Sequence, residues 1–106
     1  MKVHEELGVL HIEGIRRLDA ANAMALRDVA RAAVAGSATT IEIDLSQTES
    51  LDSCGLGALI AIRNMIDRQG GVVRLLNPTR LAQRILELTR LHRVLEIVYC
   101  DQILAS

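Results

Sequence analysis

The sequence predicts a single α/β domain over residues 1–106, with a mostly parallel sheet of four to five strands. Short segments that alternate apolar and polar residues indicate strands, and segments with apolar residues three and four positions apart indicate helices. These segments follow one another in the order ββαβαβαβ with short connections. Strands that alternate with helices favour a parallel sheet joined by helical crossovers.

The first half of the chain begins with two strands and a helix. A short strand is expected around Val3 and a second over residues 9–15, where apolar and polar side chains partly alternate. Asp19 or Asn22 can cap the helix that follows, and Gly36 fits its end. The apolar face of that helix comprises Leu26, Val29, Ala30, Ala33 and Val34.

The middle of the chain contains the clearest strand and the most apolar helix. Residues 39–45 alternate and are rich in β-branched side chains, which predicts a strand. A polar connection over residues 46–50 leads to a helix that Gly70 and Gly71 end, and residues 72–76 then predict another strand. That helix is expected to be well buried, because its apolar face is broad: Leu56, Leu59, Ile60, Ile62, Met65 and Ile66.

A third helix and a last short strand complete the predicted order. Asn77 is expected to cap this helix, with Pro78 at its first position, where the missing N–H costs nothing. The strand is expected over residues 95–98. The expected apolar face of the helix comprises Leu81, Ile85 and Leu88.

Composition and charge exclude several classes of function. Half of the residues are apolar, and the only aromatic residue is Tyr99. Most modules that read RNA sequence stack bases on aromatic side chains, and nucleic-acid binders carry an excess of basic residues. Here 12 basic residues stand against 13 acidic ones, so direct contact with nucleic acid is not expected.

The protein is expected to be cytoplasmic and not inserted in a membrane. Its first residues are too acidic for a signal peptide, and its longest apolar run, residues 54–62, is far shorter than the ~20 residues that span a bilayer. Two cysteines, Cys54 and Cys100, cannot make a disulfide framework, so reduced thiols are expected. The cysteines and the three histidines show no metal-ligand spacing, so neither a metal nor another cofactor is expected.

One segment combines small and polar residues at a junction between a strand and a helix. Residues 44–46 (Asp-Leu-Ser) end the clearest strand, and residues 51–57 (Leu-Asp-Ser-Cys-Gly-Leu-Gly) open the most apolar helix. Ser53 is placed where this helix begins, so its hydroxyl is expected to be exposed. Three amides are expected to point outward without helical partners: those of Cys54, Gly55 and Leu56. Free amides at a helix start favour an anion such as a phosphate on Ser53, although a serine also serves there simply as a cap.

In this order of elements, the chain resembles the STAS domain, the fold of bacterial anti-sigma factor antagonists. That family has a strand ending in Asp-Leu-Ser and a helix opening with Asp-Ser-Ser-Gly-Leu-Gly, which residues 44–46 and 51–57 resemble. The resemblance continues through residues 70–78 and 85–91 and covers nearly the whole chain.

Three positions depart from the family pattern. Cys54 replaces the usual second serine, which keeps a small side chain but changes the surface beside Ser53. Arg16 stands where the family often has glycine, and Gly14 comes two residues earlier, which affects the turn before the first helix. Arg90 replaces a common glycine after the third helix.

The resemblance implies a protein-binding switch controlled by phosphorylation. Ser53 corresponds to the serine that an anti-sigma factor serine/threonine kinase phosphorylates and that a phosphatase restores. Asp52 corresponds to the acidic residue beside it, and Asp19 to an acidic position near the phosphorylation site. The implied partner-binding surface comprises Asp19, Asp52, Ser53, Cys54, Gly55, Leu56 and Gly57. Such a protein is a kinase substrate and not an enzyme, and it regulates transcription indirectly.

Two alternatives are an accessory subunit of a phospholipid ABC transporter, bound to its ATPase, and a scaffold subunit of a stress-signalling complex. Subunits of that transporter tend to carry a threonine near the position of Ser53, which favours the switch. Gly55 and Gly57 suit any of these partners, because they keep the first helical turn free of bulky side chains.

The remaining candidate residues are assigned simpler roles. Cys54 could be a reactive thiol at a helix start, but a small buried residue is the preferred interpretation. No Gly-x-Ser-x-Gly elbow supports a hydrolase, and structural or solvated roles are expected for His4, His11 and His92. A solvated basic face, with an Arg84–Glu87 pair, is expected for Arg80, Arg84, Arg90 and Arg93. Contact of this face with an acidic partner is the alternative.

Overall fold

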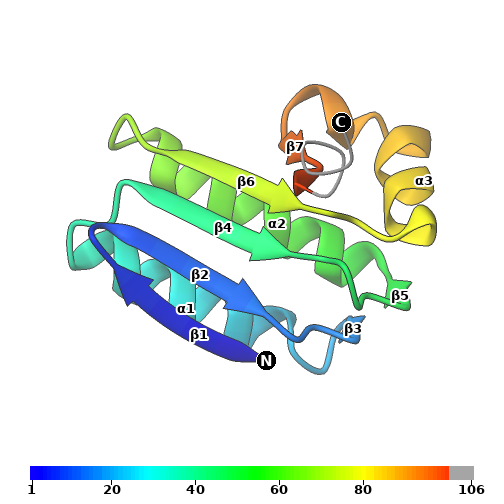
Figure 1. Ribbon diagram of the computed structural model, residues 1–106, viewed down its shortest axis with the longest axis horizontal. Coiled ribbons are helices and arrows are strands. Elements are labelled where there is room, and N and C mark those ends of the chain that lie inside the picture. The colour runs from blue at the N-terminus through cyan, green and yellow to red at the C-terminus, as the bar shows by residue number, and fades with distance from the viewer. Residues whose placement is uncertain (101–106) are drawn as a thin grey trace.

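A five-stranded, mostly parallel sheet forms the centre of the protein, as predicted. The computed structural model describes residues 1–100. The strands lie in the order β1-β2-β4-β6-β7, with β1 antiparallel to β2 and all other neighbours parallel (Figure 1). Their bounds are β1 Lys2–Glu6, β2 Val9–Glu13, β4 Thr40–Asp44, β6 Val72–Leu76 and β7 Glu96–Val98.

Helices α1 (Ala23–Ala35) and α2 (Ser53–Asp67) pack side by side and cover one face of this sheet (Figure 1). Strand residues at every second position face these helices, because side chains alternate across a sheet. The buried strand residues are Leu10, Ile12, Ile41, Ile43, Val73 and Leu75. On the helices the buried apolar residues include Leu26, Ala30, Ala33, Ala58, Leu59, Ile62 and Ile66. Within residues 1–100, no helix is long and apolar enough to cross a membrane.

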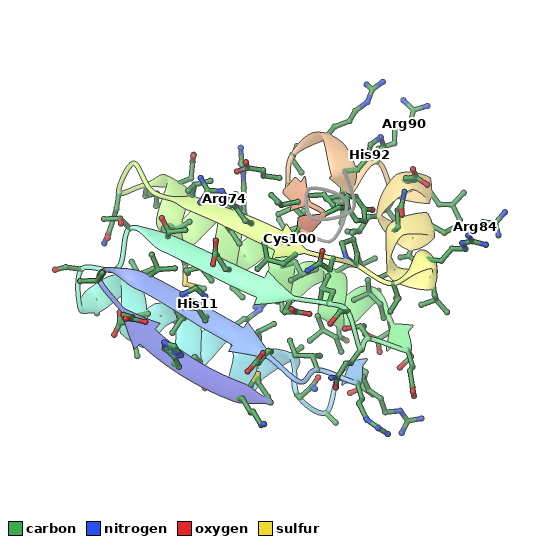
Figure 2. The ribbon with its side chains drawn as sticks, viewed as in Figure 1. His11, Arg74, Arg84, Arg90, His92 and Cys100 are labelled. Atoms are coloured by element: carbon green, nitrogen blue, oxygen red, sulfur yellow. The ribbon has the colours of Figure 1, made fainter. Side chains whose placement is uncertain are left out.

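The other face of the sheet carries a row of polar side chains, one from each strand. Strand register places His4 opposite His11, His11 opposite Glu42, Glu42 opposite Arg74, and Arg74 opposite Glu96. The Nδ1 atom of His11 lies 3.0 Å from Oε1 of Glu42, and Nε of Arg74 lies 3.2 Å from Oε2 of Glu96. Figure 2 shows His11 and Arg74 on this face. The row gives the uncovered face a solvated surface, as expected for His11.

A second, two-stranded sheet was not predicted. Strands β3 (Arg17–Leu18) and β5 (Ser50–Leu51) pair in parallel beyond the ends of β2 and β4 (Figure 1). The predicted strand over residues 9–15 was too long, because the chain turns at Gly14, which has φ +74°. Two residues per strand are too few to show an alternating pattern, so periodicity could not reveal this pairing.

Thr48 ties the polar connection between β4 and β5 into the fold. Its side chain is fully buried, and its hydroxyl donates to the carbonyl of Ile15 at 2.7 Å. Its own carbonyl accepts a hydrogen bond from the hydroxyl of Thr79, also at 2.7 Å. Thr79 in turn caps α3 (Arg80–Leu88) by accepting from the Ala82 amide. Thr48 therefore joins the chain after β2 to the start of α3.

The predicted start of α3 was wrong. Its cap is Thr79, and Asn77 instead has φ +50° and accepts a hydrogen bond from the Cys100 amide at 2.8 Å. Asn77 directly follows β6, and its amide also donates to the carbonyl of Val98, the last residue of β7. Asn77 therefore secures the last strand of the sheet, and the helix begins at Arg80, two residues later than predicted.

The predicted apolar face of α3 was also wrong. Ala82 and Leu86 are buried, whereas Leu81 and Leu88 are 45% and 77% exposed. The inward face consists of one small alanine and one leucine, so the other two leucines, on the adjacent side, dominated the sequence pattern. Only Ile85 of the predicted face packs against the core, and it does so partly.

Several arginines lie on or after α3, and Figure 2 shows Arg84 and Arg90 projecting outward there. Within residues 1–100, the expected Arg84–Glu87 ion pair does not form. Arg90 adopts φ +63° before the short 3₁₀ helix η1 (Leu91–Arg93), a left-handed conformation that glycine adopts without steric cost.

Replacing Thr48 with valine is expected to destabilise the protein by about 1–3 kcal/mol, because the carbonyl of Ile15 loses its donor in a buried setting. Urea denaturation monitored by circular dichroism measures this loss. Thr40→Val is the matched control: Thr40 is a half-buried strand threonine, and valine suits a strand, so a change within about 0.5 kcal/mol is expected. Equal stability of the two variants would show that the Thr48 bond contributes nothing.

Candidate functional site

The small β3–β5 sheet brings the two predicted acidic residues together. Leu18 pairs with Leu51 in this sheet, and the amide of Asp52 donates to the carbonyl of Leu18 at 3.2 Å. Asp19 and Asp52 follow these paired residues directly. Because β3 and β5 are parallel, both residues lie at the same end of this two-stranded ribbon. Ser53 comes next, as the first residue of α2.

Asp52, and not Ser53, caps α2. Its carboxylate accepts from the Gly55 amide at 2.9 Å, and its carbonyl accepts from the Leu56 amide at 2.9 Å. The expectation that these two amides point outward without partners was therefore wrong, and of the three only that of Cys54 is left uncapped by Asp52. The side chain of Ser53 is relieved of capping and is exposed to solvent.

Asp19 occupies a closed turn before α1. Its carboxylate accepts from the Ala21 amide at 3.0 Å, and its own amide donates to the side chain of Asn22 at 3.0 Å. The side-chain amide of Asn22 then donates to the carbonyl of Arg17. Asn22 is the first flanking residue of α1, as predicted, but its side chain secures this turn and does not cap the helix. The turn before α1 therefore forms even though Arg16 stands where the STAS family often has glycine.

The two glycines of α2 have different reasons to be glycine. Gly55 is buried, and a Cβ atom there would lie 2.4 Å from the carbonyl oxygen of Leu18. A Cβ at Gly57 would lie 3.5 Å from Nη2 of Arg27, which is an ordinary contact. Gly55 therefore permits β3 to pack on α2, whereas Gly57 leaves room beneath an arginine of α1.

A hollow of about 280 Å³ lies between the starts of α1 and α2. Its walls combine apolar side chains from α1, one cation, the serine hydroxyl and the cysteine thiol. The lining residues are Ala20, Ala23, Met24, Arg27, Ser53, Cys54 and Gly57. Cys54 is exposed, so its expected burial was wrong. The arrangement can receive a protruding group of a partner beside Ser53.

Sequence reasoning missed Met24 and Arg27 as members of this site. Both lie outside the predicted apolar face of α1. Their position in the sequence pattern therefore indicates that they are near the surface, but it does not indicate which residues they contact. The structure places Asp19 and Asp52 at the same end of the β3–β5 sheet, and Ser53, which follows Asp52, at the rim of the hollow. Leu56 is half-buried and packs against the core.

The single tyrosine lies in a different hollow, of about 530 Å³, which Glu87 and Ile97 also line. Burial of the phenol raises the pKa of Tyr99, and the nearby Glu87 carboxylate raises it further. Within residues 1–100, no cluster of three or more metal-ligating side chains forms.

Comparison with known families matches residues 1–100 to the STAS domain. The chain belongs to the STAS domain family. A Thermotoga maritima protein, provisionally assigned as an anti-sigma factor antagonist, is 40% identical over 53 residues. That match covers 50% of this chain and 47% of the relative, so it spans about half the length of each.

Solved structures of similar proteins have the same fold. The crystal structure of a Thermotoga maritima protein with the same provisional assignment has a TM-score of 0.84 at 26% identity, covering 92% of this chain and 84% of that one. An anti-sigma factor antagonist from Mycobacterium paratuberculosis has a TM-score of 0.80 at 28% identity, covering 98% of this chain and 89% of that one.

More distant structures share the fold alone. The Bacillus cell fate determinant SpoIIAA in its phosphorylated form has a TM-score of 0.70 at 18% identity, covering 98% of this chain and 96% of that one. A sulfate transporter family protein from Wolinella succinogenes has a TM-score of 0.72 at 18% identity, covering 94% of this chain and 84% of that one. The STAS fold therefore occurs in proteins of more than one function.

Replacing Gly55 with alanine is expected to destabilise the protein by about 1–3 kcal/mol, because the new Cβ forces β3 away from α2. Gly57→Ala is the matched control on the same helix, and it is expected to be neutral or to stabilise by up to about 1 kcal/mol through helix propensity. Urea denaturation of both variants measures the difference. A Gly55→Ala variant as stable as wild type would contradict the close packing of Leu18 on α2.

Proposed function

We propose that this protein is an anti-sigma factor antagonist that binds an anti-sigma factor serine kinase until phosphorylation of Ser53 turns it off. The observation that supports this most directly is the position of Ser53. Its hydroxyl is exposed at the first residue of α2 and at the rim of the hollow, beside Asp52. The relatives named anti-sigma factor antagonists support the same function.

The proposed binding surface is the ribbon end and the first turn of α2. It comprises Asp19, Asp52, Ser53, Cys54, Gly55, Leu56 and Gly57. Gly55 is buried, so it contributes by letting β3 hold Asp19 near Ser53 and not by touching the partner. The surface is largely backbone and small side chains, which suits close approach by another protein.

Phosphorylation adds about −1.5 to −2 charges to this surface. In the transfer, the Ser53 oxygen attacks the γ-phosphorus of ATP, the bond to the leaving ADP breaks, and the hydroxyl proton goes to a base of the kinase. The new charge lies where the partner sat, so rebinding is disfavoured until a phosphatase hydrolyses the phosphate.

Affinity purification from the native cell with two variants as baits tests this function. The Ser53→Ala protein is expected to retain an ATP-dependent anti-sigma factor serine kinase, and Ser53→Asp is expected to lose it by at least about tenfold, because the added carboxylate repels the partner surface. Ser37→Asp is the charge control, since Ser37 lies exposed after the far end of α1. Mass spectrometry quantifies the kinase on each bait.

Equal recovery of the kinase on the Ser53→Ala and Ser53→Asp baits would overturn the switch. Recovery of a transporter ATPase, with Ser53 never modified in the native protein, would assign the chain to the phospholipid transporter instead. Recovery of a large stress-signalling assembly without a kinase would assign it to a scaffold.

A further inference from the structure

We propose that Arg27 is the built-in counter-ion of a phosphate on Ser53, so that phosphorylation draws the phosphate across the hollow and closes it. This inference rests on the proposed phosphorylation of Ser53. It adds a residue of α1 to the switch. In the inactive state the phosphate then fills the hollow, in addition to making the surface more negative.

The position of the guanidinium supports this role. Nη2 of Arg27 lies 3.5 Å from the point that a Cβ of Gly57 would occupy. Gly57 follows Ser53 by four residues, so the two share one face of α2, separated by ~6 Å along the helix axis. Arg27 and Ser53 also line the same hollow. Helical side chains lean toward the N-terminus, so a phosphate on Ser53 must turn back across that single turn to meet the guanidinium.

Arg27 is also available for a new partner. Its neighbour on α1, Arg31, pairs with Asp28 at 2.9 Å, whereas Arg27 makes no ion pair within residues 1–100. Arg27 is half-buried and rests on the bare backbone of Gly57, so packing already holds it in place. A planar guanidinium that is fixed beforehand loses little side-chain entropy when it binds two phosphate oxygens.

The other charges around Ser53 make a counter-ion necessary. Asp52 precedes Ser53, and Asp19 lies at the same end of the β3–β5 sheet as Asp52, so both carboxylates disfavour a phosphate here. Each is held in place by an amide, that of Gly55 or that of Ala21. The Cys54 thiol is the remaining titratable group at the rim. Arg27 is the cation that lines the hollow, so it determines the direction in which the phosphate turns.

Incorporation of phosphoserine at position 53 during translation tests this pairing without any kinase. Phosphorus NMR then follows the second ionisation of the phosphate across a pH titration. In Arg27→Gln we expect the midpoint to rise by about 0.5 pH unit or more relative to wild type, because loss of the cation disfavours the dianion. Arg31→Gln, on the same helix, is the matched control and is expected to leave the midpoint unchanged.

A midpoint that is the same in Arg27→Gln and Arg31→Gln would overturn the pairing. Arg27→Lys keeps the charge and is expected to fall between wild type and Arg27→Gln, which separates loss of charge from a change of fold. Because the phosphoserine is incorporated during translation and needs no kinase, failure here leaves the kinase-binding result intact. Conversely, a native protein that is never phosphorylated would overturn the proposed function while this measurement still stood.

Discussion

The close packing of Leu18 on Gly55 is the constraint on which the rest of the site depends. The carbonyl of Leu18 occupies the space that any other side chain at position 55 would need, and it also accepts the Asp52 amide. One carbonyl therefore fixes both the two-stranded ribbon and the start of α2. With β3 held there, Asp19 lies beside Asp52, and the beginning of α1 lies close enough to α2 to form the hollow. A shift of β3 would separate all of these at once.

Most of the scaffold could be predicted from the sequence, because its strands and first two helices bury regular apolar faces. Residues 39–45 and the broad apolar face of α2 carried that signal, and the position of Ser53 at the helix start followed from it. The ribbon could not be predicted, since two-residue strands have no period. Thr48 could not be distinguished from its solvated neighbours, because its burial depends on Ile15 and Thr79, which are distant in sequence. The contact between Arg27 and Gly57 likewise exists only once α1 packs on α2.

Two kinds of polar interaction have separate tasks in this domain. The row of polar side chains from His4 to Glu96 keeps the uncovered face of the sheet solvated. The ion pairs within this row are exposed to solvent and individually weak. The hydrogen bonds of Thr48 are buried. They connect the loop after β4 with the segment after β2 and with the start of α3, so they hold the loops that lead to the site. A switch that acts by a single charge needs such a rigid support, because a mobile loop would simply move away from the added phosphate. The buried bonds of Thr48 supply that support, and we propose that Arg27 supplies the countercharge.

Phosphorylation of the purified protein by the proposed anti-sigma factor kinase tests the central claim most directly. Tandem mass spectrometry after incubation with the kinase and ATP is expected to find one phosphate, on Ser53, in the wild-type protein and none in Ser53→Ala. The exposed Ser46 on the preceding loop serves as an internal control, because it lacks the setting at the helix start and the hollow. Phosphate on Ser46 with Ser53 unmodified, or an unmodified protein that the kinase nonetheless binds, would contradict the account.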